Sequence, residues 1–353
     1  MYKLSEISEN NIINSLIAGF DRSPDQCNKP HESDAEIIRV GDLILAITTD
    51  SISEEISTGL YDDPYFAGWM IVTVNLSDLA AVAASPIGIL ITEIIPKDYS
   101  TEKLQQLQRG ISDACRKYNT YVLGGDTNEG NNLVLTGTAI GKIDSEKCLT
   151  RIGCKSGDIL YSSGKLGIGN AYAVSKFISQ RDLYQDYKPE ARITESQIIN
   201  KYSSCCMDTS DGFISALDQL MRLNDVGFEL NSDWQKTINT TALKYAKNHN
   251  IPPWLLVAGQ HGEFELIFTI PKKLKNFFLN DALQNGFAPV ESGKVIAEKE
   301  VKIPLYNKVV QIDTKFIRNL LNETQGDVKT YLKTLLEYDF QLKNEVYRNF
   351  TTH

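Results

Sequence analysis

The sequence predicts an α+β protein of two domains, and the organisation of each half supports this prediction. In the first half, short apolar strands that end in acidic residues flank a segment with helical spacing. In the second half, a strand, a glycine-rich loop and a helix follow one another over 158–177 and open a new α/β unit. The 353 residues, 42% of them hydrophobic, are enough for two domains that each bury a core.

The first half is expected to contain three strands and one helix. The run Leu43–Thr49 is apolar and β-branched and leads into Asp50, which predicts a buried strand with a carboxylate at its C-terminal end. The segment YVLGGD at 121–126 predicts a second strand ending in an acid, and 133–141 predicts a third. Between these strands, apolar residues recur at helical spacing and predict a helix. They are Leu104, Leu107, Ile111, Cys115 and Tyr118.

The second half adds further strands and helices. CCMD at 205–208 reads as a strand that leads into a helix over 212–223, and LIFTI at 266–270 reads as another strand. An amphipathic C-terminal helix with a polar tail is expected from Val328, Leu332, Leu335 and Leu336. The predicted domains are therefore 1–148 and 149–320, followed by a helical extension over 321–353.

Composition and charge exclude some classes of partner. The formal net charge of −9 opposes a nucleic-acid surface, which needs a basic footprint, and favours a small molecule as partner. The longest apolar stretch, Met70–Pro96, is interrupted by polar residues, and residues 1–20 contain no uninterrupted apolar core. We expect no membrane segment and a cytoplasmic location.

Six aspartates are the candidate functional residues. Each is expected at a strand end, a tight turn or the start of a helix, where side chains can converge on a cleft, although caps and turns use the same positions. Threonine, serine and glycine surround them, and hydroxyl and backbone oxygens complete the coordination of hard cations. Several carboxylates in one cleft repel each other unless cations neutralise them, which favours Mg²⁺ bridging a phosphate. The six are Asp34, Asp50, Asp78, Asp126, Asp208 and Asp211.

Five sequence blocks resemble, in order and spacing, the signature blocks of thiamine-monophosphate kinases, which belong to the aminoimidazole-ribonucleotide-synthetase (AIR synthase-related) superfamily. The resemblance implies a two-domain fold, a homodimer whose N-terminal halves form a shared β-barrel, and ATP bound with several Mg²⁺ ions. The blocks are TTDS at 48–51, NLSDLAAVAASP at 75–86, GGDT at 124–127, LTRIGCKSGD at 149–158 and MDTSDG at 207–212.

The same resemblance implies roles for individual residues. The six aspartates match the family's metal-binding acids, with Thr49 helping to hold a metal. Catalysis would rest on Asp50, Asp126 and Arg151, which position the metals and neutralise charge on the γ-phosphate. No nucleophile or strong general base is needed, because an acceptor that already carries a phosphate is anionic. Contacts with ATP are implied for Gly124, Gly125, Arg151 and Ser210.

Two segments on the acceptor side depart from the family's pattern. TTDSISEEIS at 48–57 places Ser57 where the family's VEGVHF segment has a substrate-contacting histidine. HGEFEL at 261–266 stands in place of the family's GEDYEL. One alignment puts Gly262 and Glu263 at the family's Glu and Asp, and a shift by one residue keeps Glu263 as a substrate contact. Both alignments stay open, with Ser57 and Glu263 as the candidate substrate contacts.

The function expected from these observations is ATP- and Mg²⁺-dependent phosphorylation of thiamine monophosphate. Because the acceptor-side segments differ, three alternatives stay open. One is a kinase of the same superfamily that uses another phosphorylated heterocycle as acceptor. The second is an ATP-dependent cyclisation of the aminoimidazole-ribonucleotide-synthetase type. The third is a catalytically silent nucleotide-binding paralogue.

Overall fold

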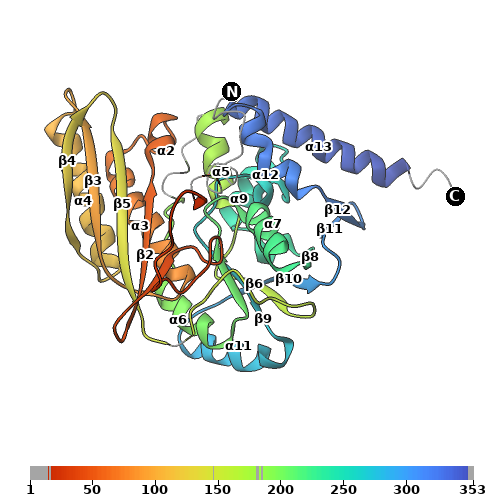
Figure 1. The fold of residues 1–353 in the computed structure, drawn as a ribbon. Helices are drawn as coiled ribbons and strands as arrows, with labels where there is room; N and C mark the ends of the chain where they lie inside the picture. Colours follow the sequence, from red (N-terminus) through yellow and green to blue (C-terminus); the bar gives the residue numbers. More distant parts are fainter. Residues whose placement is uncertain (1–14, 16, 146, 180–182, 184–185, 349–353) are drawn as a thin grey trace.

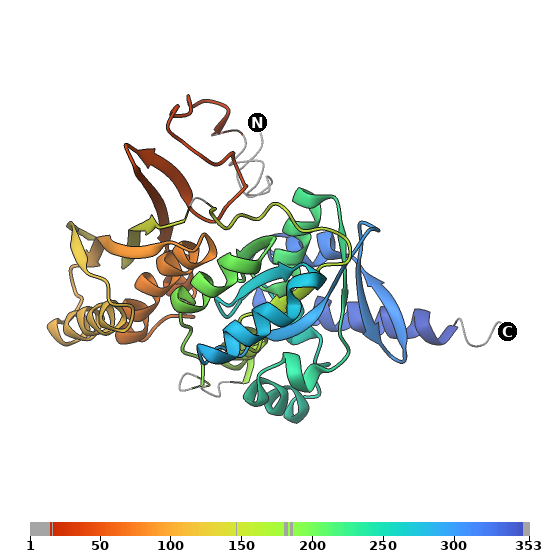
Figure 2. The ribbon, with the colours of Figure 1, turned by 90° about the horizontal axis from the view of Figure 1, so that it is seen from below.

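The computed structural model describes residues 15, 17–145, 147–179, 183 and 186–348. Two β-sheets lie side by side, one in each half of the chain, with helices between and around them (Figure 1). Figure 2 shows that the N-terminal sheet and the C-terminal end of the last helix lie at opposite ends of the molecule. This mixed α+β architecture agrees with the predicted fold class.

The N-terminal sheet has five strands in the order β1-β2-β5-β3-β4. Only β3 and β4 pair in parallel, and the other pairs are antiparallel. Among the described residues this sheet is open, so a single chain forms no closed barrel. The strands are β1 Glu36–Val40, β2 Leu43–Ser51, β3 Ser85–Pro96, β4 Val122–Gly130 and β5 Val134–Ile143.

Helix α3 (Pro64–Ala81) lies between the two halves of the molecule. Asp63 caps its N-terminus by accepting a hydrogen bond from the Phe66 amide, and Pro64 fits the first helical position. Almost every residue of α3 is buried, because the helix packs on β2, β3 and β5 on one side and on β7 and α6 (Ile193–Tyr202) on the other. It therefore couples the N-terminal sheet to the second one.

Helix α4 (Thr101–Lys117) packs closely against α3. Ser100 accepts a hydrogen bond from the Lys103 amide and caps the helix, which buries one apolar stripe. A Cβ on Gly110 would lie 1.9 Å from the Tyr65 carbonyl oxygen of α3, so only glycine permits this approach.

The second sheet has seven strands in the order β12-β11-β8-β10-β6-β9-β7. All of its pairs are antiparallel except β8 with β11. Its strands are β6 Ile159–Ser162, β7 Cys205–Asp208, β8 Gly227–Leu230, β9 Leu266–Ile270, β10 Val290–Ile296, β11 Val301–Leu305 and β12 Lys308–Ile312. The remaining helices are α2 Ser53–Ser57, α5 Ile168–Val174, η2 Ser175–Ser179, α7 Phe213–Asn224, α8 Trp234–Thr237, α9 Thr240–Asn248, α10 Leu255–Ala258, η3 Lys272–Leu274, α11 Lys275–Gln284, α12 Thr314–Glu323 and α13 Val328–Arg348.

Most elements predicted from the sequence are confirmed, with one clear exception. Strand β4 does not end at Asp126 as predicted, because its parallel pairing with β3 continues to Gly130. The helix predicted at the C-terminus is α13, and buried Leu342 and Val346 extend its apolar stripe toward Arg348. The domain boundaries at 148 and 320 stay predictions. No described helix is both long and apolar enough to cross a membrane.

Candidate active site

Three carboxylates from distant parts of the chain meet where the two halves join. Asp34 precedes β1, Asp78 lies in the last turn of α3, and Asp208 ends β7. Each offers one oxygen, and these oxygens lie within 4.8 Å of one another. We call these three residues the acid cluster. Its residue types and spacing suit a hard divalent cation, which prefers oxygen ligands.

Hydroxyl groups orient the acid cluster. The Thr48 hydroxyl donates to Asp78 Oδ2 at 2.5 Å, and the Ser77 hydroxyl donates to Asp208 Oδ2 at 2.7 Å. Ser210 Oγ also donates to Asp208, at 3.0 Å to Oδ1. These contacts fix the carboxylates while leaving lone pairs on their oxygens for a ligand.

Burial and mutual repulsion raise the pKa values of carboxyl groups in the acid cluster. Burial, followed by the charges of Asp50 and Asp208, raises the pKa of Asp78 well above its ordinary value. Burial and the charge of Asp34 raise the pKa of Asp208 to about 7. Carboxylates held this close together retain their charge at neutral pH only when positive charge compensates them.

Arg151 supplies part of that positive charge. Its Nη2 lies 2.9 Å from Asp34 Oδ1, and both side chains are largely buried. The second oxygen of Asp34, Oδ2, is buried and has no hydrogen-bond partner in the described part of the chain. A buried carboxylate oxygen without a partner is costly, so Asp34 Oδ2 has a free position for a bound cation.

Asp50 and Asp211 border the acid cluster. Asp50 lies on β2, its amide donates to Asn75 Oδ1 at 3.1 Å, and burial raises its pKa. Asp211 lies in the turn before α7, close enough that its charge raises the pKa of Asp208. Five of the six predicted aspartates are thus gathered around one place.

Asp126 and Thr49 lie apart from that place. Asp126 is exposed in the middle of β4 and accepts a hydrogen bond from Asn128 at 2.6 Å. Because β4 is three strands away from β2, the two strands are separated by roughly 14 Å. The Thr49 hydroxyl pairs with Thr138 at 2.8 Å, on the opposite face of β2 from Thr48. Gly124 and Gly125 lie on β4 with Asp126.

Two predicted local placements are wrong. Asp78 was expected at a strand end, a turn or a helix start, but it occupies the last turn of a long buried helix. Asp126 lies within a strand, because β4 continues past it. The site also contains a residue that was not predicted, Thr48. Period-two alternation along β2 was a usable signal for it, since it puts Thr48 and Asp50 on one face.

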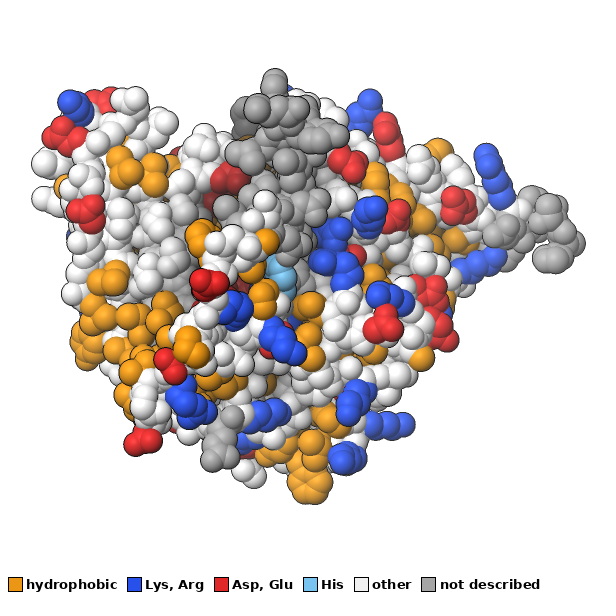
Figure 3. Space-filling view, viewed as in Figure 1, with side chains coloured by type: hydrophobic (Ala, Val, Ile, Leu, Met, Phe, Trp, Pro, Cys, Tyr) orange, Lys and Arg blue, Asp and Glu red, His pale blue; other side chains and the backbone are white. Residues whose placement is uncertain are grey.

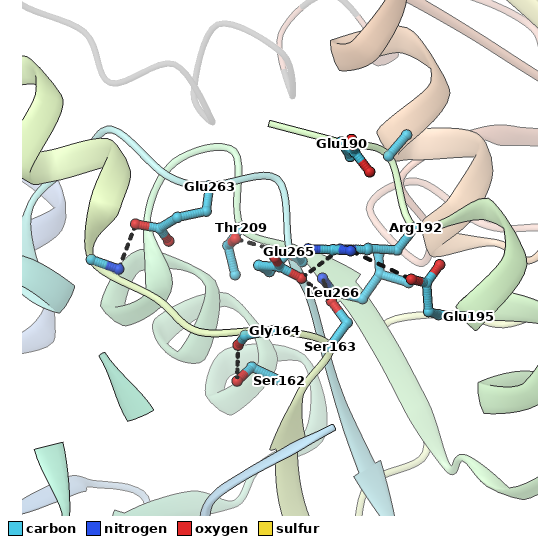
Figure 4. Close-up of polar contacts among 12 residues, drawn as sticks. Ser162, Ser163, Gly164, Glu190, Arg192, Glu195, Thr209, Glu263, Glu265 and Leu266 are labelled. Carbon is cyan, nitrogen blue, oxygen red and sulfur yellow. Dashed lines mark hydrogen bonds and ion pairs between the residues drawn. The ribbon is translucent and has the colours of Figure 1, made fainter. Parts of the chain in front are cut away.

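Glu263 holds the glycine-rich loop. Its Oε1 accepts hydrogen bonds from the amides of Gly167 at 2.6 Å and Gly169 at 3.1 Å, where α5 begins (Figure 4). Burial raises the pKa of Glu263 to about 8. Ser57, by contrast, is exposed at the end of α2, and its hydroxyl donates to the Glu54 carbonyl oxygen at 2.8 Å.

A second buried acid in the same segment, Glu265, was not predicted. Figure 4 shows it beside Arg192, whose Nε donates to Glu265 Oε2 at 2.8 Å, while Ser163 donates to the same oxygen. This ion pair joins the residue just before β9 to the N-terminus of α6. The charge of Glu265 is thereby compensated within the fold.

Comparisons with known proteins point to one superfamily. A family model described as "AIR synthase related protein, N-terminal domain" matches residues 32–143. The thiamine-monophosphate kinase of Pyrococcus horikoshii is 27% identical over 274 residues, which cover 76% of this chain and 84% of the relative. That of Methanocaldococcus jannaschii is 29% identical over 289 residues, with coverage of 76% and 86%.

The fold matches solved structures as well. The structure "AaThiL complexed with AMPPCP and TMP" superposes with a TM-score of 0.73 and 23% identity, covering 89% of this chain and 99% of that one. At this identity the superposition speaks for the fold alone. The chain is thus similar in sequence to curated thiamine-monophosphate kinases, and its residues 32–143 match the N-terminal domain of AIR synthase related proteins.

Proposed function

We propose that the protein transfers the γ-phosphate of ATP to thiamine monophosphate, yielding thiamine diphosphate and ADP. The observation that carries the proposal is the acid cluster, in which three carboxylate oxygens converge and Asp34 Oδ2 has no partner among the described residues. The curated relatives named thiamine-monophosphate kinase support the choice of reaction.

Mg²⁺ fits this site on chemical grounds. Asp34, Asp78 and Asp208 would hold it, with Asp50 and Asp211 at the border of the cluster, and the raised pKa values of Asp78 and Asp208 mark a deficit of positive charge. When bound, Mg²⁺ supplies charge neutralisation on the phosphate oxygens.

The chain's own residues would position the phosphates. The ion pair with Asp34 holds Arg151 beside the acid cluster, where its guanidinium supplies a permanent positive charge. Ser210 lies in the turn before α7, next to Asp208, where its hydroxyl and amide can meet a phosphate oxygen. The phosphate oxygen of the acceptor is already anionic, so alignment and charge neutralisation suffice for in-line attack.

A homodimer would give a role to the predicted residues that lie apart from the acid cluster. These residues are Asp126, Thr49, Gly124 and Gly125. Every residue of β4 from Val122 to Glu129 is exposed, and apolar side chains gather beside it. Figure 3 shows hydrophobic side chains on the side of the molecule where the N-terminal sheet lies. A second chain pairing with this sheet would cover the apolar surface and give Asp126 neighbours from both chains. The apolar side chains are Ile87, Leu90, Tyr121, Val122 and Leu123.

The test is ADP release from the purified protein with Mg-ATP, with and without thiamine monophosphate. We expect release that depends on thiamine monophosphate and is lost in Asp50→Asn. The matched control is Asp42→Asn, which removes the same charge from the turn between β1 and β2. ADP release that ignores thiamine monophosphate, or that survives Asp50→Asn, would refute the proposal.

A further inference from the structure

A large cavity reaches Asp211, one of the two aspartates that border the acid cluster. It has a volume of about 990 Å³ and lies between α2, α5, α9, α10 and the C-terminal helices, with Asp211 among its lining residues. Apolar side chains of Phe177, Leu332, Leu336 and Phe340 form much of its wall. A volume of this size accommodates a complete organic ligand rather than a phosphate group alone.

Three buried polar atoms in the wall of this cavity have no hydrogen-bond partner among the described residues. They are Glu55 Oε2, His249 Nε2 and His261 Nε2. Buried polar atoms are almost always paired, so three orphans around one cavity indicate groups whose partner is a ligand. Glu55 belongs to α2, five residues after Asp50, and it is close enough to the phosphate end for the charges of Asp211 and Asp50 to act on it.

The chemistry of these atoms selects a kind of ligand. Burial, with the neighbouring charges of Glu54 and Asp211, raises the pKa of Glu55. Burial lowers the pKa of His261 to about 4, so its imidazole is neutral and offers one donor and one acceptor nitrogen. Such a pair can exchange hydrogen bonds with a ring that carries an amino group beside a ring nitrogen.

Buried aromatic rings pack against His261 at this polar end of the cavity and hold its imidazole in place. The His261 ring lies 5.8 Å from Tyr61, 5.3 Å from Tyr187 and 6.2 Å from Tyr172, measured between centroids. Tyr61 also lies close to Glu55, whose backbone carbonyl accepts a hydrogen bond from the Tyr61 amide at 3.0 Å. The aromatic side chains that line the cavity itself are Phe177, Tyr245, Tyr331 and Phe340, so a flat heterocycle would find both aromatic neighbours and hydrogen-bond partners there.

Resting on the phosphotransferase function proposed above, we propose that this cavity holds the organic body of the acceptor and that Glu55 accepts a hydrogen bond from an amino group on its heterocyclic ring. His261 is the second partner of that ring. The acidic surroundings of Glu55 disfavour an anionic or purely accepting group at this end, because its lone pairs would meet negative charge. The aminopyrimidine ring of thiamine monophosphate has the required chemistry.

The placement of Ser57 agrees with this assignment. Ser57 stands where the family's VEGVHF segment has its substrate-contacting histidine, but its side chain is exposed. Glu55 lies two residues earlier on the same short helix, where that segment has a glycine, and it lines the cavity. In this chain, Glu55 thus takes over the contact with the acceptor that the family makes from the position of Ser57.

The experiment measures binding separately from turnover. Calorimetric titrations of protein loaded with Mg-AMPPCP would measure the affinities for three ligands. These are thiamine monophosphate and its two halves, the aminopyrimidine with a hydroxymethyl group and the hydroxyethylthiazole phosphate. We expect Glu55→Gln to weaken binding of thiamine monophosphate and of the pyrimidine about tenfold, and to leave the thiazole phosphate unchanged. The matched control, Glu298→Gln, removes the same charge from an exposed residue that does not line the cavity and should change none of the three affinities.

A thermal unfolding midpoint equal to that of the unmodified chain verifies that Glu55→Gln folds. A second variant, His261→Asn, should likewise weaken binding of thiamine monophosphate and of the pyrimidine but not of the thiazole phosphate. In turnover, the KM for thiamine monophosphate should rise while kcat is kept. Equal affinities of the unmodified chain and Glu55→Gln, or no binding of the pyrimidine to the unmodified chain, would overturn the inference. Glu55-dependent binding without phosphate transfer would support the inference and refute the proposed reaction instead.

Discussion

The two ends of the candidate active site are built on different principles. At the phosphate end, Asp78 and Asp208 receive hydrogen bonds from neighbouring hydroxyls, and Arg151 pairs with Asp34. At the acceptor end, the wall is largely apolar, and Glu55 Oε2 and His261 Nε2 have no hydrogen-bond partner in the part of the chain that the structure describes. The phosphate end is organised before any ligand arrives, whereas the acceptor end is completed by its ligand.

The largest expected effect concerns the phosphate end. Asp208→Asn removes a ligand from the acid cluster and should lower kcat for ADP release by about a hundredfold or more, because preorganised charge is the main source of catalysis here. Asp225→Asn is the matched control, since Asp225 is exposed and pairs only with Lys299 among the contacts described. A steady-state rate within a factor of about two of the unmodified chain in Asp208→Asn would remove the acid cluster from the mechanism.

A smaller effect is expected at the acceptor end. Ending the chain at Phe340 removes buried Leu342 and Val346, which hold α13 against the body of the protein. Because α13 forms part of the cavity wall, the KM for thiamine monophosphate should rise about tenfold, whereas the affinity for nucleotide should stay the same.

The control for this truncation is a chain that lacks only 349–353, which should behave like the full chain. Steady-state kinetics and titration with AMPPCP give the two readouts. Loss of nucleotide affinity together with acceptor affinity would mean that α13 supports the whole fold, and the contrast between the two ends would fail.

The smallest effect distinguishes the hydroxyls of two successive residues of β2, of which only Thr48 contacts the acid cluster. Thr48→Val removes the donor to Asp78 Oδ2 and should lower kcat several-fold, which corresponds to about 1 kcal/mol, the usual net contribution of one hydrogen bond. Thr49→Val loses only the contact with Thr138 in the single chain. If Thr49→Val has the larger effect on kcat at limiting Mg²⁺, then Thr49 holds a metal as the family resemblance implies.

The sequence predicted the strands of the phosphate end better than its helix. The run Leu43–Thr49 and the CCMD segment are short, apolar and followed by acids, which is the pattern of a buried strand edge. Helix α3 escaped prediction because it is buried on all sides, so its sequence has no amphipathic period. Asp78 could therefore be identified as a candidate from the residues around it in the sequence, but its local structure was predicted wrongly.

The acceptor end was beyond sequence reasoning for a different reason. Glu55 and His261 lie in the two acceptor-side segments at 48–57 and 261–266, but the sequence does not show which side chains of these segments face a ligand. That depends on buried atoms such as Glu55 Oε2 and His261 Nε2, which have no hydrogen-bond partner among the described residues of the folded chain. Their proximity to α13 depends on packing between segments almost three hundred residues apart in sequence. At the phosphate end most of the acids stand in short blocks with threonine, serine or glycine beside them, whereas the residues that line a shaped cavity need no common pattern.

The most direct test of the central claim follows the phosphate itself. With γ-labelled ATP, thiamine monophosphate and increasing Mg²⁺, chromatography of the products should find the label in thiamine diphosphate, with formation that requires Mg²⁺ and is lost in Asp208→Asn. Label released only as inorganic phosphate, or transferred equally well without a divalent cation, would contradict the account.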